Sequence, residues 1–321
     1  MKILVTGGAG YIGAITAFEL ASSGHEVVVF DHFKTHSVEK IGNLPYLVGD
    51  LNSYSAVKEA LEKIRPHAVM HFAAYIQMGE SVENPRKYYE NNVLGSFNLA
   101  RAMVETGVDK LIFSSSAGIY GNPASLPIKE DAPPLPTNPY GETKLAVERM
   151  FRWYEKPYGL RSISIRYFNA AGASLNGKYG EDHAEESHLI PNILSAQKED
   201  REFTLFGGDY PTPDGTCVRD YIHVADLVEA HIKALSKLES GASSNYYNAG
   251  TGKGYSNMEV IKMVEEVTGK PVRIKILPRR DGDASTLVAD VTKIKAELNW
   301  TPKHSDLATI VRSAYSWHSD N

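Results

Sequence analysis

A tyrosine and a lysine four residues apart could together perform acid–base chemistry. Tyr140 and Lys144 fall near the start of the stretch 139–158, which the sequence predicts to be helical, so their side chains share one helix face. An ammonium group beside a phenol stabilises the phenolate and lowers the tyrosine pKa, which lets the phenolate accept a hydroxyl proton near neutral pH. Ser116, which closes the serine run 114–116, could hydrogen-bond to the same oxygen. A lone Tyr-x-x-x-Lys pair is more often an ordinary helix start, so the surrounding sequence has to decide.

A glycine-rich segment near the N-terminus suits a phosphate group. Gly7, Gly10 and Gly13 directly follow a short apolar run and open a helix-length stretch that begins with Tyr11 and Ile12. In such a turn the first glycine permits a tight bend, the second lets the backbone approach a pyrophosphate, and the third lets the helix pack closely on the sheet. The helix N-terminus adds the positive end of its dipole. The segment predicts a dinucleotide site, with a purely structural glycine turn as the alternative.

Further strand ends favour the dinucleotide. Asp31 ends the second apolar run, where an acid accepts hydrogen bonds from the adenosine ribose and repels a 2′-phosphate, so NAD is favoured over NADP. Other candidate cofactor contacts follow the third and fourth runs, and these are Asp50, Leu51, Phe72, Ala73 and Ala74. An aspartate after the third run can reach the adenine amino group. Together these positions predict NAD as the cofactor.

Short apolar runs alternate with helix-length stretches through the first half of the chain. The expected strands are 2–6, 26–30, 46–48, 68–72, 110–114 and 161–168, and the expected helices are 12–23, 53–64, 86–106 and 139–158. The runs are continuously apolar, which is typical of parallel strands covered on both faces. The pattern predicts an α/β fold with a doubly wound parallel sheet, the Rossmann architecture.

The alternation becomes irregular beyond about residue 168. Two stretches, 172–186 and 207–216, are rich in glycine, proline and acidic residues, and long loops of this kind are usually functional. Helices at 224–239, 256–268 and 305–318 and a strand at 246–249 complete this part. We therefore expect residues 1–168 to form an NAD-binding domain and residues 169–321 a smaller α/β substrate domain, with segments crossing back to the first sheet.

The composition excludes several classes of protein. The 321 residues are 42% hydrophobic and 23% charged, with a formal net charge of −5, which is ordinary for a globular chain. The chain has no excess of basic residues, which argues against nucleic acid and anionic membranes as partners. No apolar run approaches the ~18 residues of a membrane span. Cys217 is the single cysteine, so no intrachain disulfide and no multi-thiolate metal site can form. We expect a soluble cytoplasmic protein.

On these motifs the chain resembles the extended short-chain dehydrogenase/reductase family and, within it, the nucleotide-sugar 4-epimerases. The resemblance spans nearly the whole chain and is carried by 5–13, 69–74, 79–82, 88–93, 113–121, 139–144, 166–172, 206–224 and 278–283. The glycine and Tyr/Lys motifs are typical of the whole superfamily. The long segment 206–224 is much more specific to the epimerases.

The resemblance implies an NAD-dependent isomerase that inverts C4 of a UDP-hexose through a transient 4-keto intermediate and so interconverts UDP-galactose and UDP-glucose. By this analogy Tyr140 removes the proton of the sugar 4-hydroxyl, and Ser116 and Lys144 complete the catalytic set; all three also contact the cofactor, and Ser116 and Tyr140 contact the sugar. Asn91 and Phe168 are further implied cofactor contacts. The implied substrate contacts are Asn169, His188, Leu189, Thr204, Leu205, Phe206, Arg219, Arg280, Asp283 and Leu287.

Some implied contacts agree with elementary chemistry. Arg219 and Arg280 suit a diphosphate, because a guanidinium group pairs bidentately with phosphate oxygens. The family also implies a homodimer formed by the helices near 86–106 and 139–158. For a lone arginine, however, a salt bridge is the more frequent role.

Departures from the family pattern leave the substrate open. Gly118 stands where many relatives carry threonine, and Ile76 and Gln77 stand where some carry lysine. Leu287 is of intermediate size at a position that faces the hexose in the family. UDP-N-acetylhexosamine or UDP-glucuronate therefore stay as alternative substrates.

Other reaction classes fit less well. A nucleotide-sugar 4,6-dehydratase would need an acid and a base directly after Ser116, where this chain has Ala117 and Gly118. A dinucleotide sensor without enzymatic activity would have lost Tyr140 or Lys144. We therefore expect an enzyme.

Histidines and acids are concentrated in one of the loops. His183 and His188 lie among Glu181, Asp182, Glu185 and Glu186. Their spacing fits no regular two-ligand helix motif. We expect a solvated loop with one ligand contact, from His188, and no metal.

Overall fold

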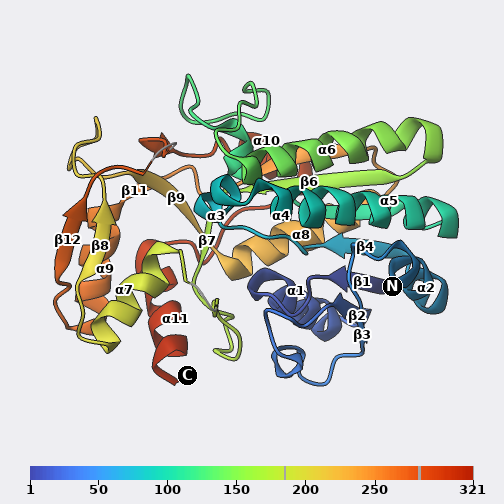
Figure 1. The fold of residues 1–321 in the computed structure, drawn as a ribbon, viewed down its shortest axis with the longest axis horizontal. Coiled ribbons are helices and arrows are strands. Elements are labelled where there is room, and N and C mark those ends of the chain that lie inside the picture. The colour runs from blue at the N-terminus through green and yellow to red at the C-terminus, as the bar shows by residue number, and fades with distance from the viewer. Residues whose placement is uncertain (184–185, 281–282, 321) are drawn as a thin grey trace. The chain divides into compact units, whose positions relative to one another are not determined.

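The computed structural model describes residues 1–183, 186–280 and 283–320 (Figure 1). The chain divides into two compact units. Unit 1 consists of Met1–Tyr120, Pro134–Arg166 and Val228–Tyr247, and unit 2 of Gly121–Pro133, Tyr167–Leu227 and Asn248–Asn321. The chain passes from unit 1 to unit 2 after Arg166, 228–247 returns to unit 1, and 121–133 belongs to unit 2.

A seven-stranded sheet with the order β10-β6-β5-β4-β1-β2-β3 is the framework of the first half. Its strands are β1 (Lys2–Thr6), β2 (Glu26–Asp31), β3 (Tyr46–Val48), β4 (Ala68–His71), β5 (Lys110–Ser114), β6 (Arg161–Tyr167) and β10 (Asn245–Ala249). Every pairing from β6 across to β3 is parallel. The strand order reverses between β1 and β4, which is the point where ligands bind in such sheets. The predicted doubly wound parallel sheet is confirmed.

Helices connect and cover these strands. They are α1 (Tyr11–Ser22), α2 (Tyr54–Ile64), α3 (Met78–Glu83), α4 (Pro85–Tyr88), α5 (Gly95–Thr106), α6 (Pro139–Tyr158) and α8 (Val224–Glu239), with 3-10 turns η1 (Val38–Ile41) and η3 (Ala117–Tyr120). The π-helical stretch η2 (Tyr89–Leu94) joins α4 to α5. The expected helix 86–106 is thus interrupted by a wider turn.

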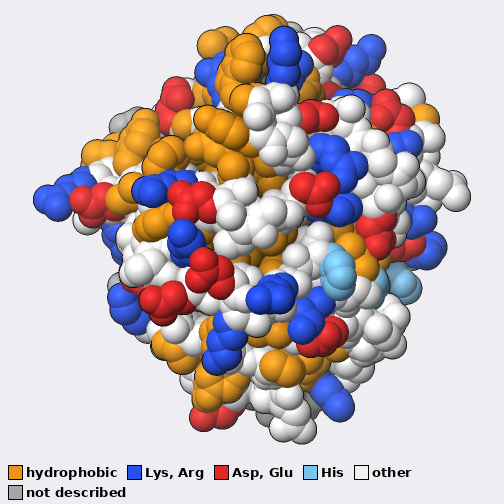
Figure 2. All heavy atoms as spheres, turned by 90° about the vertical axis from the view of Figure 1, so that its right-hand side faces the viewer, with side chains coloured by type: hydrophobic (Ala, Val, Ile, Leu, Met, Phe, Trp, Pro, Cys, Tyr) orange, Lys and Arg blue, Asp and Glu red, His pale blue; other side chains and the backbone are white. Residues whose placement is uncertain are grey.

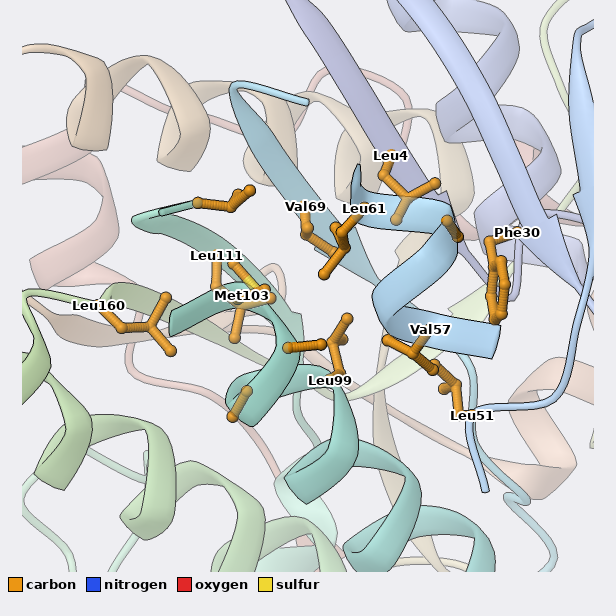
Figure 3. Close-up of a cluster of buried hydrophobic side chains, with 14 of the residues drawn as sticks. Leu4, Phe30, Leu51, Val57, Leu61, Val69, Leu99, Met103, Leu111 and Leu160 are labelled. Atoms are coloured by element: carbon orange, nitrogen blue, oxygen red, sulfur yellow. The ribbon is translucent and has the colours of Figure 1, made fainter. Parts of the chain in front are cut away.

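The core of unit 1 lies between the sheet and its helices (Figure 3). Leu4, Val69 and Leu111 of the strands pack with Leu61 of α2 and Leu99 of α5, and all are at most 1% exposed. Complete burial of such a side chain contributes about 1.5–3 kcal/mol. This packing holds the carboxyl ends of β1, β4 and β5 in fixed relation to one another.

Unit 2 is built around smaller sheets. One has the order β11-β9-β13, with β7 also paired to β9, and another pairs β8 with β12. The elements are β7 (Asn169–Ala171), α7 (Leu189–Lys198), β8 (Phe203–Phe206), β9 (Val218–His223), β11 (Gly254–Ser256), α9 (Asn257–Thr268), β12 (Ile274–Leu277), β13 (Thr286–Leu287), α10 (Thr292–Leu298) and α11 (Leu307–Asp320). Residues of α7, α9 and α11, such as Ile193, Val260 and Ile310, form its core.

Several of these elements were not expected from the sequence. Helix α7 contains Pro191, which suggests a break, but proline in the first turn removes no intrahelical hydrogen bond. Strands of two to four residues such as β11 and β13 are too short for a periodic pattern. None of the described helices is long and apolar enough to cross a membrane.

Candidate active site

The glycine turn after β1 is closed on one side and open on the other. Gly7 has a φ of 69°, and a Cβ there would lie 2.4 Å from the nitrogen of Ala73. A Cβ on Gly13 would lie 2.2 Å from the carbonyl oxygen of Gly7. Gly10 is the N-cap of α1, and a Cβ there would meet no described atom closer than 3.4 Å. The open side, at a helix N-terminus that no described side chain caps, fits a pyrophosphate bound by backbone N–H groups and the helix dipole.

Asp31 and Asp50 lie at neighbouring strand ends. Asp31 accepts hydrogen bonds from the backbone N–H of Ala9 at 3.1 Å and of Phe33 at 3.0 Å, so it also supports the glycine turn. Asp50 accepts one from Lys34 Nζ at 3.1 Å. Burial opposes ionisation of Asp50, but a backbone N–H and Lys34 lower its pKa overall. Both carboxylates are therefore positioned as acceptors, as an adenosine moiety requires.

The other predicted cofactor residues differ in what they can offer. Phe72, Ala73 and Ala74 follow β4 and are half-buried, and the Phe72 ring lies 5.0 Å from that of His231. Leu51 is 8% exposed and belongs to the hydrophobic core, so mainly its backbone is available. Tyr11 and Ile12 are half-buried in the first turn of α1.

The π-helical stretch contains two asparagines with different roles. Asn92 is buried; its Oδ1 accepts from the backbone N–H of Tyr75 at 2.9 Å, and its Nδ2 donates to Tyr75 O and Thr143 Oγ1, both at 3.1 Å. It therefore connects the segment after β4 to α6. Asn91, the predicted cofactor contact, is half-buried and donates to Asn92 Oδ1 at 3.0 Å. Asn92 was missed because no sequence signal separates two adjacent asparagines, although π turns often mark functional sites.

Helix α6 begins at a well-defined point. Asn138 caps it by accepting from the backbone N–H of Gly141 at 2.9 Å, and Pro139 occupies the first helical position, where proline costs no hydrogen bond. A Cβ on Gly141 would lie 2.6 Å from the carbonyl oxygen of Gly118. Glycine at 141 thus lets α6 approach η3 closely, which places Tyr140 beside the end of β5.

The three predicted catalytic residues come together here. Lys144 Nζ donates to the carbonyl oxygen of Ser114 at 2.7 Å and lies 5.9 Å from the centroid of the Tyr140 ring. A Cβ on Gly118 would lie 3.2 Å from Ser116 Oγ and 3.6 Å from Tyr140 Cε1, so both side chains border this position. Burial lowers the pKa of Lys144 to about 7. A phenol, a lysine and a hydroxyl in this arrangement can exchange a proton with an alcohol.

A buried ion pair lies next to these residues and was not predicted from the sequence. Glu148 is one turn beyond Lys144 and accepts from Ser115 Oγ at 3.0 Å and from Arg166 Nε at 3.0 Å. Arg166 also donates to the hydroxyl of Tyr120 at 2.8 Å. The side chains of Glu148 and Arg166 are 8% and 5% exposed. No local sequence pattern marks this pair, because Glu148 lies in α6 and Arg166 in β6.

In unit 2 several predicted substrate residues form two groups, one at β9 and β13 and one at the end of β8. Arg219 Nη2 lies 3.6 Å from Asp283 Oδ1, and Leu287 is paired with Arg219 in the parallel register of β13 on β9. The Arg280 guanidinium carbon lies 4.0 Å from the centroid of the Phe206 ring. Two guanidinium groups, a carboxylate and an aromatic ring suit a diphosphate, a ribose and a base.

For four other predicted residues of unit 2, the structure gives the burial or the strand pairing. Asn169 pairs with Tyr221 of β9 and is half-buried. Phe168 is 8% exposed and Thr204 is half-buried. Leu205 is 1% exposed and its side chain belongs to the core of unit 2, so only its backbone can contact a ligand.

His188 is the N-cap residue of α7, directly before Leu189. Its Nδ1 faces Glu181 Oε1 and lies 3.5 Å from Glu186 Oε1. Burial alone disfavours the charged ring, but the two carboxylates outweigh it and raise the pKa of His188 to about 10. The expected solvated loop is wrong for Glu181, which is 3% exposed.

A doubly wound sheet with a glycine turn and a Tyr/Lys pair at its carboxyl edge defines an enzyme of the short-chain dehydrogenase/reductase type. The chain belongs to the NAD dependent epimerase/dehydratase family, whose model matches residues 3–250. The predicted resemblance is therefore confirmed, and with it NAD as the cofactor.

Individual relatives are similar over their whole length. The UDP-glucose 4-epimerase of Halalkalibacterium halodurans is 46% identical over 322 residues, which cover 100% of this chain and 96% of that protein. The crystal structure of UDP-glucose 4-epimerase from Brucella ovis in complex with NAD has a TM-score of 0.95 at 43% identity, covering 98% of this chain and 97% of that one. The UDP-glucose 4-epimerase from Bifidobacterium longum, in complex with NAD+ and UDP, has a TM-score of 0.93 at 35% identity, covering 100% and 99%.

Proposed function

We propose that this protein is an NAD-dependent isomerase that interconverts UDP-galactose and UDP-glucose by inverting C4 of the hexose. The observation that carries the proposal is the placement of Tyr140, Lys144 and Ser116 around one point at the end of β5. The full-length similarity to proteins named UDP-glucose 4-epimerase supports it.

The chain's own residues have distinct tasks in this reaction. Tyr140 accepts the proton of the sugar 4-hydroxyl and later returns it to the same oxygen, once the hydride has been restored to the opposite face of C4. The ammonium form of Lys144 favours the phenolate of Tyr140, and Ser116 hydrogen-bonds to the same sugar oxygen. NAD, when bound at the glycine turn, supplies the acceptor and donor for the hydride of C4.

The reaction also requires that the 4-keto sugar is retained while its ring turns. Tight binding of a remote part of a substrate can provide this without close contacts to the reacting sugar. Arg219 and Arg280 suit the diphosphate of UDP, Asp283 suits ribose hydroxyls, and Phe206 suits the uracil. We assign these residues to the UDP moiety.

The decisive assay uses the purified protein without added nucleotide. Incubation with UDP-galactose should yield UDP-glucose, because the cofactor is regenerated in each cycle. Parallel incubations with UDP-N-acetylhexosamines and UDP-glucuronate determine whether these alternative substrates are accepted. If no UDP-sugar is converted at C4, the proposal is wrong; a 4-keto-6-deoxy product would instead indicate a dehydratase.

We further propose a homodimer in the cytoplasm. In Figure 2, hydrophobic side chains gather in the upper half of the face toward which α5 and α6 run in Figure 1. Leu94 of η2, Phe97 of α5 and Trp153 of α6 are 45%, 42% and 79% exposed, and exposed apolar groups of this size favour an interface. Light scattering on the purified protein measures the mass, and a monomer at micromolar concentration would contradict the dimer.

A further inference from the structure

Two histidines and two glutamates of unit 2 converge on one point. Glu181, His183, Glu186 and His188 each offer one oxygen or nitrogen atom, and these atoms all lie within 4.8 Å of one another. His183 Nδ1 is 3.4 Å from both Glu181 Oε1 and Glu186 Oε2, and His188 Nδ1 is 3.5 Å from Glu186 Oε1. In a tetrahedral Zn²⁺ site with ligands at about 2.1 Å, neighbouring ligand atoms are about 3.4 Å apart. These three separations match the edges of such a tetrahedron, whereas His188 Nδ1 and Glu181 Oε1 are in direct contact and would have to move apart to bind the same ion.

Two atoms of this cluster are buried without a hydrogen bond. Glu181 is 3% exposed, yet its Oε1 makes no hydrogen bond to any residue that the structure describes. The same is true of His188 Nδ1, which faces this oxygen at ion-pair range. Buried polar atoms of this kind normally have a partner. The two atoms face each other as an ion pair, and a cation bound by both would replace this contact with two metal–ligand bonds.

The surroundings hold the cluster in place. Glu186 Oε1 accepts from the backbone N–H groups of Ser187 and His188, both at 2.8 Å, which fixes the carboxylate. A Cβ on Gly180 would lie 2.3 Å from the ring of Trp317 in α11, so the segment leading to Glu181 is packed tightly against that helix. Hydrogen-bonded carboxylates and fixed backbone are typical of the shell around metal ligands.

We propose that Glu181, His183, Glu186 and His188 form a divalent-cation site that connects the segment before α7 to the N-cap residue of that helix. Two imidazole nitrogens and two carboxylate oxygens suit Zn²⁺, and four protein ligands leave no position open for catalysis, so the role is structural. Because His188 and Leu189 are assigned to the substrate, the cation fixes the backbone of that part of the substrate site. The inference concerns metal content and stability and holds independently of the reaction catalysed.

The test measures bound metal in the full-length protein. Purified protein is stripped with a chelator, loaded with ZnCl₂ and desalted, and zinc is determined by mass spectrometry; the wild type should retain about one Zn²⁺ per chain. His183→Gln and Glu186→Gln should lose most of this zinc, since each removes one ligand. His67→Gln is the matched control, because His67 is exposed and lies in unit 1, and it should retain zinc as the wild type does.

Two further readouts separate a ligand role from a folding defect. Circular dichroism at room temperature should show His183→Gln to be folded, and ZnCl₂ should raise the Tm of the wild type but not of this variant. Cobalt loading should give the strong visible absorption of a tetrahedral site. Zinc content that is near zero in the wild type, or equal in the wild type and His183→Gln, would overturn the proposal and leave an ion-pair cluster only. A loss of zinc in His67→Gln would show surface binding and overturn it as well.

Discussion

The Nζ of Lys144 donates a hydrogen bond to the carbonyl oxygen of Ser114 at 2.7 Å, which joins the first turns of α6 to the end of β5. Tyr140 precedes Lys144 by one helix turn, and Ser116 follows Ser114 by two residues. One contact between a helix and a strand end therefore sets the positions of a base, a cation and a hydroxyl. Each of these can be tested by substitution.

Tyr140→Phe should lower turnover steeply while NAD stays bound. The substitution removes only the hydroxyl that accepts the proton, and loss of a general base costs about 10²–10⁴-fold in rate. The kcat for UDP-galactose and the nucleotide content of the purified variant are the measurements. An unchanged kcat would mean that another group is the base.

Lys144 should make the stability of the nucleotide-free protein depend on pH. Burial lowers its pKa from 10.5 to about 7, so between these values the unfolded chain holds a proton that the folded chain has released. The free energy of unfolding must then rise with pH, by about 2 kcal/mol between pH 7 and 9. Below pH 7 both states are protonated and this contribution no longer changes.

Lys144→Met removes this dependence and serves as the reference. Urea unfolding of both proteins at pH 6, 7, 8 and 9 measures their free energies of unfolding. The variant should exceed the wild type most at low pH, and the difference should shrink as the pH rises. Parallel curves for the two proteins would show that the folded and unfolded pKa values of Lys144 are alike.

The buried pair of Glu148 and Arg166 should behave as one unit in stability. Removing one partner leaves a buried charge uncompensated, which costs about 3–5 kcal/mol. We expect this loss in the free energy of unfolding for Glu148→Gln and for Arg166→Met. The double variant should lose much less than the sum of the two single losses. Equilibrium unfolding of the four proteins measures the coupling, and additive effects would argue that the two side chains do not depend on each other.

How much of the fold and the site the sequence predicts depends on whether the interacting residues are near or far apart in the sequence. The strands β1 and β5 have the bounds expected from their apolar runs. The proposed catalytic residues Tyr140 and Lys144 could be named from the sequence because they are only four residues apart. The Arg166–Glu148 pair and the pairing of β8 with β12 are long-range, and no local pattern reports them.

Burial is the second property that local patterns miss. Glu181 was expected in a solvated loop because acidic residues usually are exposed. Its burial depends on the packing of Gly180 against Trp317, which is far away in the sequence. Leu205 is a predicted substrate contact, and because its side chain lies in the core of unit 2, only its backbone is available for that contact.

Gly10→Ala should fold normally and weaken NAD binding. Gly10 has a φ of −76°, which alanine adopts readily, and its nearest described neighbour would be 3.4 Å from the new methyl group. The methyl group would instead occupy the open side of the turn, to which we assign the pyrophosphate. We expect at least about a tenfold loss in NAD affinity, or 1.4 kcal/mol, with an unchanged Tm of the nucleotide-free protein. Gly79→Ala in α3, where a Cβ meets nothing within 4 Å, is the control.

Arg280 and Arg279 are neighbours with different partners, which makes them a matched pair for testing the UDP site. Arg279 donates to Asp209 Oδ1 at 2.7 Å, whereas the Arg280 guanidinium lies over Phe206 and is assigned to the diphosphate. A hydrogen bond to a charged group contributes about 1.5–3 kcal/mol, so Arg280→Met should weaken UDP binding about tenfold or more by calorimetry. Arg279→Met removes the same charge one residue away and should leave UDP affinity nearly unchanged. Equal losses in both variants would show that the effect is the net charge of this segment, and Arg280 would then not be a specific ligand of the diphosphate.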